Sequence, residues 1–157
     1  MYHLAQLNIA QLVAPLDSLQ LKGFVDQLEG INALADNAPG FVWRLQTEEG
    51  DATGIDAFGD DIIVNLSVWE NAEALRAFVY GVAHRDVMRG RRQWFKKMEA
   101  AHLVMWWIKK GDLPTVEDAR DRLDHLRAQG HSARAFDFRH LYPIAQPCGR
   151  PTPKRTD

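Results

Sequence analysis

The stretch DIIVNLSVWENAEALRAF, residues 61–78, predicts a strand that is followed at once by a helix. Over 62–69 one set of alternate side chains is apolar and the other is mixed, which is the period of a strand with two different faces. Asn71 comes directly afterwards and is a residue type that caps helix N-termini. We therefore expect a strand over 62–69 and a long helix over 71–98.

The rest of the chain repeats this order on either side. We expect further strands over 2–10, 41–47 and 102–109, and a helix between Ser18 and Pro39. A last helix is expected over 115–129, with Thr115 and Asp118 as a capping box. The long helix is expected to bend near Gly81 or Gly90. This order predicts an α+β, ferredoxin-like fold: a four-stranded antiparallel sheet with two main helices on one face and an extra C-terminal helix. We expect one domain over 1–140 and a proline-rich tail over 141–157.

Composition bounds the class of protein. The chain has 157 residues, 19 basic against 21 acidic side chains, a formal net charge of -2 and a single cysteine. Near-balanced charge gives no reason to expect nucleic acid or a membrane as partner. Phosphate-binding glycine loops, nucleophile elbows and dinucleotide fingerprints do not occur in the sequence. We expect a soluble, cytoplasmic protein.

One face of the predicted sheet mixes amides, arginine and tryptophan. The residues expected on it are Gln6, Asn8, Val42, Arg44, Gln46, Asn65, Ser67 and Trp69, with either Val104 and Trp106 or Met105 and Trp107. We expect the two main helices to cover the other face, and two mixed faces to pack together in a homodimer around a half-polar cavity for a small-molecule ligand. The alternative is an ordinary solvated face.

Two residues are the candidates for catalysis. His84 titrates near neutral pH and is either a general base or a packing histidine at the dimer interface. Asn8, together with Asn65, either stabilises an oxyanion or pairs across neighbouring strands. Ser67 is a further hydrogen-bonding candidate for the ligand.

The remaining candidates are expected to hold the ligand. Arg44 either binds a carboxylate or pairs with Glu48 or Asp60. Trp69 and Trp106 either form flat walls or only pack, and Tyr80 lies on the same side of the helix as His84. The basic stretch over 85–97 is expected to be a solvated helix face. No metal site is expected, because His102, His125, His131 and His140 lack metal-ligand spacing.

Several stretches carry a family resemblance: HLAQLNIA (3–10), NALADNAPGFVWRLQ (32–46), VNLSVWENAEALRAFVYGVAHR (64–85) and PTVEDARDRLDHLR (114–127). They resemble an uncharacterised bacterial family, domain of unknown function 3291, within the superfamily of dimeric α/β-barrel, antibiotic-biosynthesis-monooxygenase-like proteins. The resemblance implies a ferredoxin-like protomer that pairs through its sheets.

The wider superfamily implies several activities rather than one. Some members oxidise polycyclic phenols without a cofactor, and others degrade haem with an asparagine on the first strand and a histidine on the second helix. Asn8 and His84 occupy these places, whereas Phe78 or Tyr80 replaces the tryptophan that the haem pattern expects. We therefore expect a small-molecule-binding protein that acts as a cofactor-independent monooxygenase-like or isomerase-like enzyme on an aromatic or polyketide-like substrate. The alternatives are a non-catalytic binding module and a haem-binding or haem-degrading protein.

Overall fold

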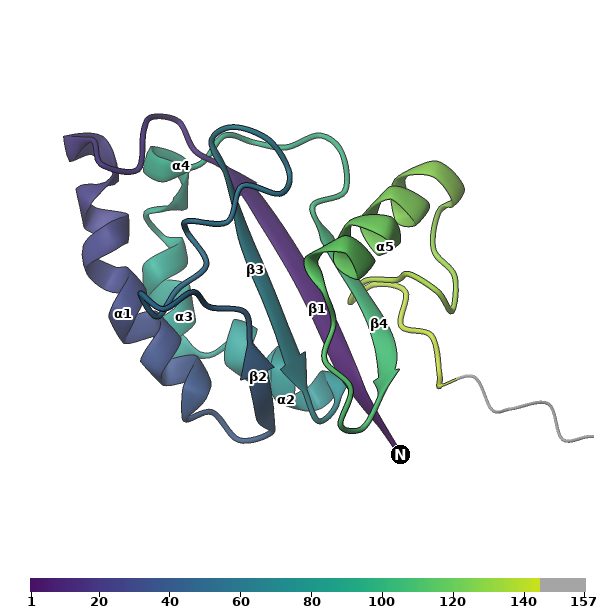
Figure 1. The fold of residues 1–157 in the computed structure, drawn as a ribbon. Helices are drawn as coiled ribbons and strands as arrows, with labels where there is room; N and C mark the ends of the chain where they lie inside the picture. The colour runs from purple at the N-terminus through teal and green to yellow at the C-terminus, as the bar shows by residue number, and fades with distance from the viewer. Residues whose placement is uncertain (145–157) are drawn as a thin grey trace, which may run out of the picture.

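The computed structural model describes residues 1–144, apart from the side chains of 82, 83 and 87 (Figure 1). Its strands are β1 (Tyr2–Gln11), β2 (Phe41–Arg44), β3 (Ile62–Trp69) and β4 (Leu103–Lys109). Its helices are α1 (Lys22–Asp36), preceded by the 3-10 turn η1 (Leu19–Leu21), α2 (Ala72–Val79), α3 (Val82–Met88), α4 (Arg91–Trp94) and α5 (Val116–Gln129).

The four strands form one antiparallel sheet in the order β2-β3-β1-β4. The strand order and the sequence of strands and helices confirm the predicted ferredoxin-like α+β fold. The register places Asn8 opposite Asn65 on β3 and opposite Leu103 on β4. One step along, Gln6 lies opposite Ser67 and Met105 in the same way. Because side chains alternate along a strand, these polar residues share one face.

The covering of the two sheet faces is the reverse of the prediction. Helices α1 to α4 lie over the mixed face, and α5 lies over the apolar face (Figure 1). The apolar face is buried against α5 and the segment between β2 and β3; the cluster contains Leu7, Leu66, Val104, Trp106, Ala119, Leu123 and Leu126, with Trp43, Leu45 and Phe58 packed against it. Burial of a continuous apolar surface away from water is favourable, and here elements of the same chain bury it.

This arrangement corrects the predicted cavity. Two mixed faces cannot pack against each other across a dimer, because the helical layer of the same chain already covers that face. The cavity instead lies inside one chain, between the sheet and the helices. Homodimerisation itself stays a prediction.

The predicted long helix over 71–98 is wrong in extent, because it divides into α2, α3 and α4. The first break follows Tyr80, the C-cap of α2, and the second lies at Gly90. A Cβ atom at Gly90 would lie 2.5 Å from the Trp94 ring, so the indole of α4 occupies the space that any larger residue would need. The predicted strand over 41–47 is also shorter: β2 ends at Arg44, and a bulge between Phe41 and Trp43 shifts its register against β3.

The helix caps agree with the sequence. The Asn71 side chain accepts a hydrogen bond of 2.8 Å from the main-chain N–H of Ala74. Thr115 and Asp118 form the reciprocal capping box, at 3.0 and 3.1 Å. None of the helices within residues 1–144 combines the length and the apolar character needed to cross a bilayer. The predicted tail from 141 falls largely outside the described residues.

Candidate functional site

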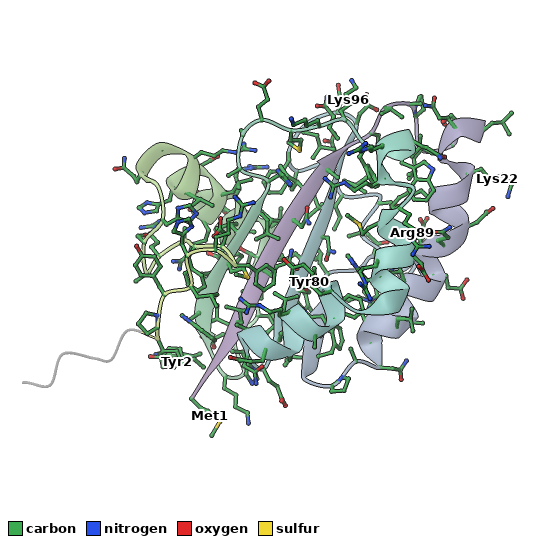
Figure 2. The ribbon with its side chains drawn as sticks, turned by 180° about the vertical axis from the view of Figure 1, so that it is seen from behind. Met1, Tyr2, Lys22, Tyr80, Arg89 and Lys96 are labelled. Carbon is green, nitrogen blue, oxygen red and sulfur yellow. The ribbon has the colours of Figure 1, made fainter. Side chains whose placement is uncertain are left out.

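A cavity of about 250 Å³ lies between the mixed face of the sheet and helices α1 to α4. Figure 2 shows the molecule from behind, with this helical layer beside the sheet. The sheet contributes polar residues, and the helices contribute mainly apolar ones. Among the lining residues are Gln6, Asn8, Arg44, Asn65, Ser67 and Trp69 from the strands, and Phe24, Leu28, Ile31, Phe78, His84 and Met88 from the helices.

A chain of hydrogen bonds orders the floor of the cavity. The Trp69 indole N–H donates to the Ser67 hydroxyl at 3.0 Å, and that hydroxyl donates to Gln6 Oε1, also at 3.0 Å. An indole nitrogen can only donate, so the hydroxyl must pass its own hydrogen to a carbonyl oxygen. This fixes the orientation of the Gln6 amide and leaves its Nε2 as a donor for a ligand. Gln6 and Ser67 are 5% and 6% exposed, so these hydrogen-bonded side chains are enclosed by the protein.

Asn8 and Asn65 lie side by side on neighbouring strands, beyond this hydrogen-bonded floor. Neither amide side chain makes a hydrogen bond within residues 1–144, so the predicted alternative of cross-strand side-chain pairing is not what the structure has. Asn65 is exposed although it lies in the middle of a central strand under the helical layer. The helices therefore leave the cavity open to solvent above this residue.

Aromatic rings form the wall next to α2 and α3. Phe41 meets the Trp69 indole edge-on, with 5.4 Å between centroids. Phe78 stacks on the same indole at 5.2 Å, with 28° between the planes. His84 then contacts Phe78 edge-on at 5.4 Å. Such a row of rings offers flat, polarizable surface to an aromatic ligand.

His84 is held as a neutral base. Burial lowers the pKa of its imidazole below the usual value of 6.5, and the main chain of Val79 partly opposes that shift. Its Nδ1 is buried and has no hydrogen-bond partner among the described residues. Near pH 7 the ring is therefore uncharged and able to accept a proton.

Arg44 lines the edge of the cavity, but its charge is already paired. The guanidinium Nε donates to Asp36 Oδ1 of α1 at 2.7 Å, and Nη1 donates to the Gly50 carbonyl at 2.7 Å. The partner is thus neither Glu48 nor Asp60, the two that the sequence suggested. Arg44 joins α1, β2 and the following loop at one corner of the cavity.

Two predicted ligand-binding residues lie elsewhere. Trp106 is on the opposite face of the sheet, 1% exposed beneath α5, with the Arg122 guanidinium 5.9 Å from its ring centre. Of the two alternatives for β4, Val104 and Trp106 thus belong to the apolar face. Tyr80 is 59% exposed and does not line the cavity, although its ring lies 6.1 Å from that of Phe138, which does (Figure 2).

Sequence reasoning missed the cavity walls that come from distant segments. Phe138 reaches the cavity from the stretch after α5, where no periodic pattern marks it. Leu28 and Ile31 of α1 show a helical apolar stripe, and a stripe of this kind equally indicates core packing. The basic side chains over 85–97, in contrast, are exposed as predicted, and Arg89 and Lys96 lie on the outer surface (Figure 2).

Comparison with known proteins identifies a family. A family model described as a domain of unknown function (DUF3291) matches residues 3–149. None of the curated proteins matches the chain. Similar solved structures include a conserved protein from Methanosarcina mazei Go1, with 11% identity and a TM-score of 0.47 over 70% of this chain and 94% of that one. Another is SnoaB, a cofactor-independent oxygenase from Streptomyces nogalater, with 14% identity and a TM-score of 0.45 over 74% and 98% of the two chains.

Proposed function

The chain belongs to the DUF3291 family, whose description names no activity, and from this premise we propose that it binds a small aromatic molecule in the cavity between the sheet and α1 to α4. The observation that carries the proposal is the shared position of His84, Asn8 and Asn65. A half-buried neutral base and two amides without side-chain partners line the same cavity as a row of aromatic rings. Apolar walls with a few directed polar groups are typical of ligand sites.

The size and the polar groups of the cavity define the ligand class. An apolar cavity of about 150 Å³ is enough to hold benzene. The space here, about 250 Å³, accommodates one or two fused rings. Gln6 Nε2 and the two asparagine amides would meet a hydroxyl or carbonyl oxygen on those rings. The ligand is therefore a phenol or an aromatic ketone.

We further propose that the protein is an enzyme that removes a proton from this ligand without a cofactor. The neutral His84 imidazole takes the proton from a phenolic O–H or from a C–H beside a carbonyl. The negative charge then develops on oxygen, where amide N–H groups of Asn8 and Asn65 stabilise it.

Two outcomes complete the reaction. Return of the proton to another carbon gives isomerisation. Alternatively, the carbanion at a ring CH₂ reacts with O₂: one oxygen atom stays as a carbonyl, the other leaves as water, and the carbon loses four electrons that O₂ gains. The monooxygenase-like alternative requires O₂ as its only co-reactant.

Deuterium exchange tests the proton transfer separately from oxygen chemistry. The probe is 2-tetralone in anaerobic D₂O, with exchange at C1 followed by proton NMR. The expected result is exchange well above the buffer rate, reduced about 10²–10⁴-fold by His84→Ala, the range that general base catalysis contributes. His102→Ala is the matched control, because it removes an exposed histidine that directly precedes β4. Exchange at the buffer rate with the wild-type protein would overturn the catalytic proposal.

Ligand binding is measured in parallel, by quenching of tryptophan fluorescence with 1-naphthol. Binding that His84→Ala changes by only a few-fold, without exchange, would assign the chain to the non-catalytic binding modules. Haem handling is the second alternative, and a hemin titration tests it: a stoichiometric Soret band that His84→Ala abolishes would support haem.

Homodimerisation also stays part of the proposal. Both sheet faces are covered within one chain, so a dimer must use another surface or displace α5. Light scattering during size-exclusion chromatography distinguishes one chain of 17.8 kDa from two.

A further inference from the structure

A second group of titratable side chains lies at the C-terminal end of the described chain, after α5. His131 Nε2 is 2.9 Å from Asp137 Oδ2, and His140 Nδ1 is 3.2 Å from Asp137 Oδ1. The two imidazole rings stack on each other, with 3.9 Å between their centroids and 28° between their planes. The ligand atoms of all three residues lie within 4.8 Å of one another.

The main chain holds this cluster in place. Gly130 ends α5 with a φ of +78°, a conformation that L side chains rarely adopt, and so turns the chain toward β4. Phe136 then exchanges two main-chain hydrogen bonds with Met105 of β4, at 2.7 and 3.0 Å. Asp137 Oδ1 accepts the main-chain N–H groups of Arg139 and His140 at 2.9 and 3.0 Å. The carboxylate is therefore oriented by the backbone before any ligand arrives.

Two imidazoles and one carboxylate whose ligand atoms lie within 4.8 Å of one another form a donor set that transition-metal ions bind. Zn²⁺ binds imidazole nitrogen and carboxylate oxygen at about 2.0–2.2 Å, which at near-tetrahedral angles separates neighbouring donors by roughly 3–3.5 Å. The two nitrogen-to-oxygen distances of 2.9 and 3.2 Å already match this spacing. We propose that His131, Asp137 and His140 bind a divalent metal ion of the Zn²⁺ class, with water completing the coordination.

The electrostatics of the cluster agree with this assignment. Burial raises the pKa of Asp137, but hydrogen bonds from His131, His140 and the Arg139 main chain outweigh it and lower the pKa below 3.8. The carboxylate is therefore ionised at neutral pH. The His140 side chain is 54% exposed and that of His131 is 31% exposed, so an ion reaches the site from solvent. Metal binding requires imidazole in its neutral form and carboxylate in its ionised form.

The site lies in the segment that completes the cavity. Tyr142 donates its hydroxyl hydrogen to the His131 carbonyl at 3.2 Å, and the Tyr142 main-chain carbonyl accepts the Trp107 indole N–H at 2.8 Å. Phe138, the residue after Asp137, lines the cavity. A bound ion would fasten 131–140 as one closed loop and so fix this wall. This role does not depend on the reaction proposed for His84.

Calorimetric titration of the full chain with Zn²⁺ tests the site. The protein carries no affinity tag and bears Cys148→Ser, so that the thiol does not compete. We expect one equivalent of Zn²⁺ to bind and the melting temperature to rise. Asp137→Asn and His140→Ala should each weaken binding at least 10-fold, with unchanged circular dichroism. His102→Ala, the matched control, should bind like the parent.

The outcomes are decisive in both directions. Binding of one ion that both cluster variants weaken and the control does not supports the site. No binding by the parent protein, or equal binding by parent and both cluster variants, would overturn it. Co²⁺ provides a second readout, because ligation by the cluster gives visible d–d absorption that Asp137→Asn should remove. Loss of exchange activity is not part of this test, so the metal proposal and the catalytic proposal fail independently.

Discussion

Replacing Ser67 by alanine isolates the hydrogen-bond chain under the cavity. The substitution removes the acceptor of the Trp69 indole N–H and the donor to Gln6 Oε1, both at 3.0 Å. Each hydrogen bond contributes about 1 kcal/mol net, and a buried donor left without a partner costs roughly 1–3 kcal/mol. Trp69 is 1% exposed, which limits the access of water to the position of the lost acceptor. We expect the free energy of unfolding to fall by about 2–4 kcal/mol.

Urea unfolding followed by circular dichroism measures this loss, and a double-mutant cycle with Gln6→Leu assigns it. The two substitutions act on the same hydrogen bond, so the double variant should lose roughly 1 kcal/mol less than the sum of the single losses. Ser18→Ala is the control, because it also removes a serine hydroxyl, but one that is exposed and donates only to the main-chain carbonyl of Pro15. Its effect should stay within about 1 kcal/mol.

Two results would refute this reasoning. A Ser67→Ala protein within about 0.5 kcal/mol of the wild type would mean that the chain of hydrogen bonds adds no stability. Strict additivity of Ser67→Ala and Gln6→Leu, to within about 0.5 kcal/mol, would mean that the two side chains do not interact in solution.

Two further predictions concern the backbone and pH. Gly40→Ala should lower the free energy of unfolding by about 2–4 kcal/mol in a urea titration, because Gly40 has a φ of +79° and a Cβ there would lie 2.5 Å from Ala74 Cβ. The unfolded chain binds the His84 proton more tightly than the folded chain, because the pKa of His84 is lowered in the fold. The free energy of unfolding should therefore fall as the pH drops below about 6.5, and the fall should end once the pH is below the pKa of His84 in the folded protein. Urea titrations at pH 7.5 and 5.5 should show a smaller fall in His84→Gln; an equal fall would contradict the shift.

Local patterns in the sequence were sufficient for the elements and for the composition of the sheet faces. Alternation over 62–69 identified a mixed set containing Asn65, Ser67 and Trp69, and these three do line one cavity. Caps at Asn71 and Thr115 also followed from local chemistry, since each depends on residues only three positions apart.

The identity of the covering layer could not be obtained in this way. Alternation of apolar and polar residues distinguishes the two faces of a strand, but it does not indicate which helix packs on which face. The stripe of α5 includes Leu123 and Leu126, and only the fold shows that these side chains cover Trp106. Likewise, the cluster of His131 and Asp137 depends on a turn after α5 whose shape comes from long-range pairing with β4.

The two outer strands of the sheet also determine how the protein behaves at high concentration. β4 is a partly covered edge, because Phe136 forms one isolated bridge with Met105 on its outer side. β2 is the other edge, and it has only four residues and a bulge. Short, bulged or covered edges offer few unpaired main-chain groups on which a second chain could add a strand. The sheet is thus protected against edge-to-edge aggregation at both ends, which favours expression and storage at high concentration.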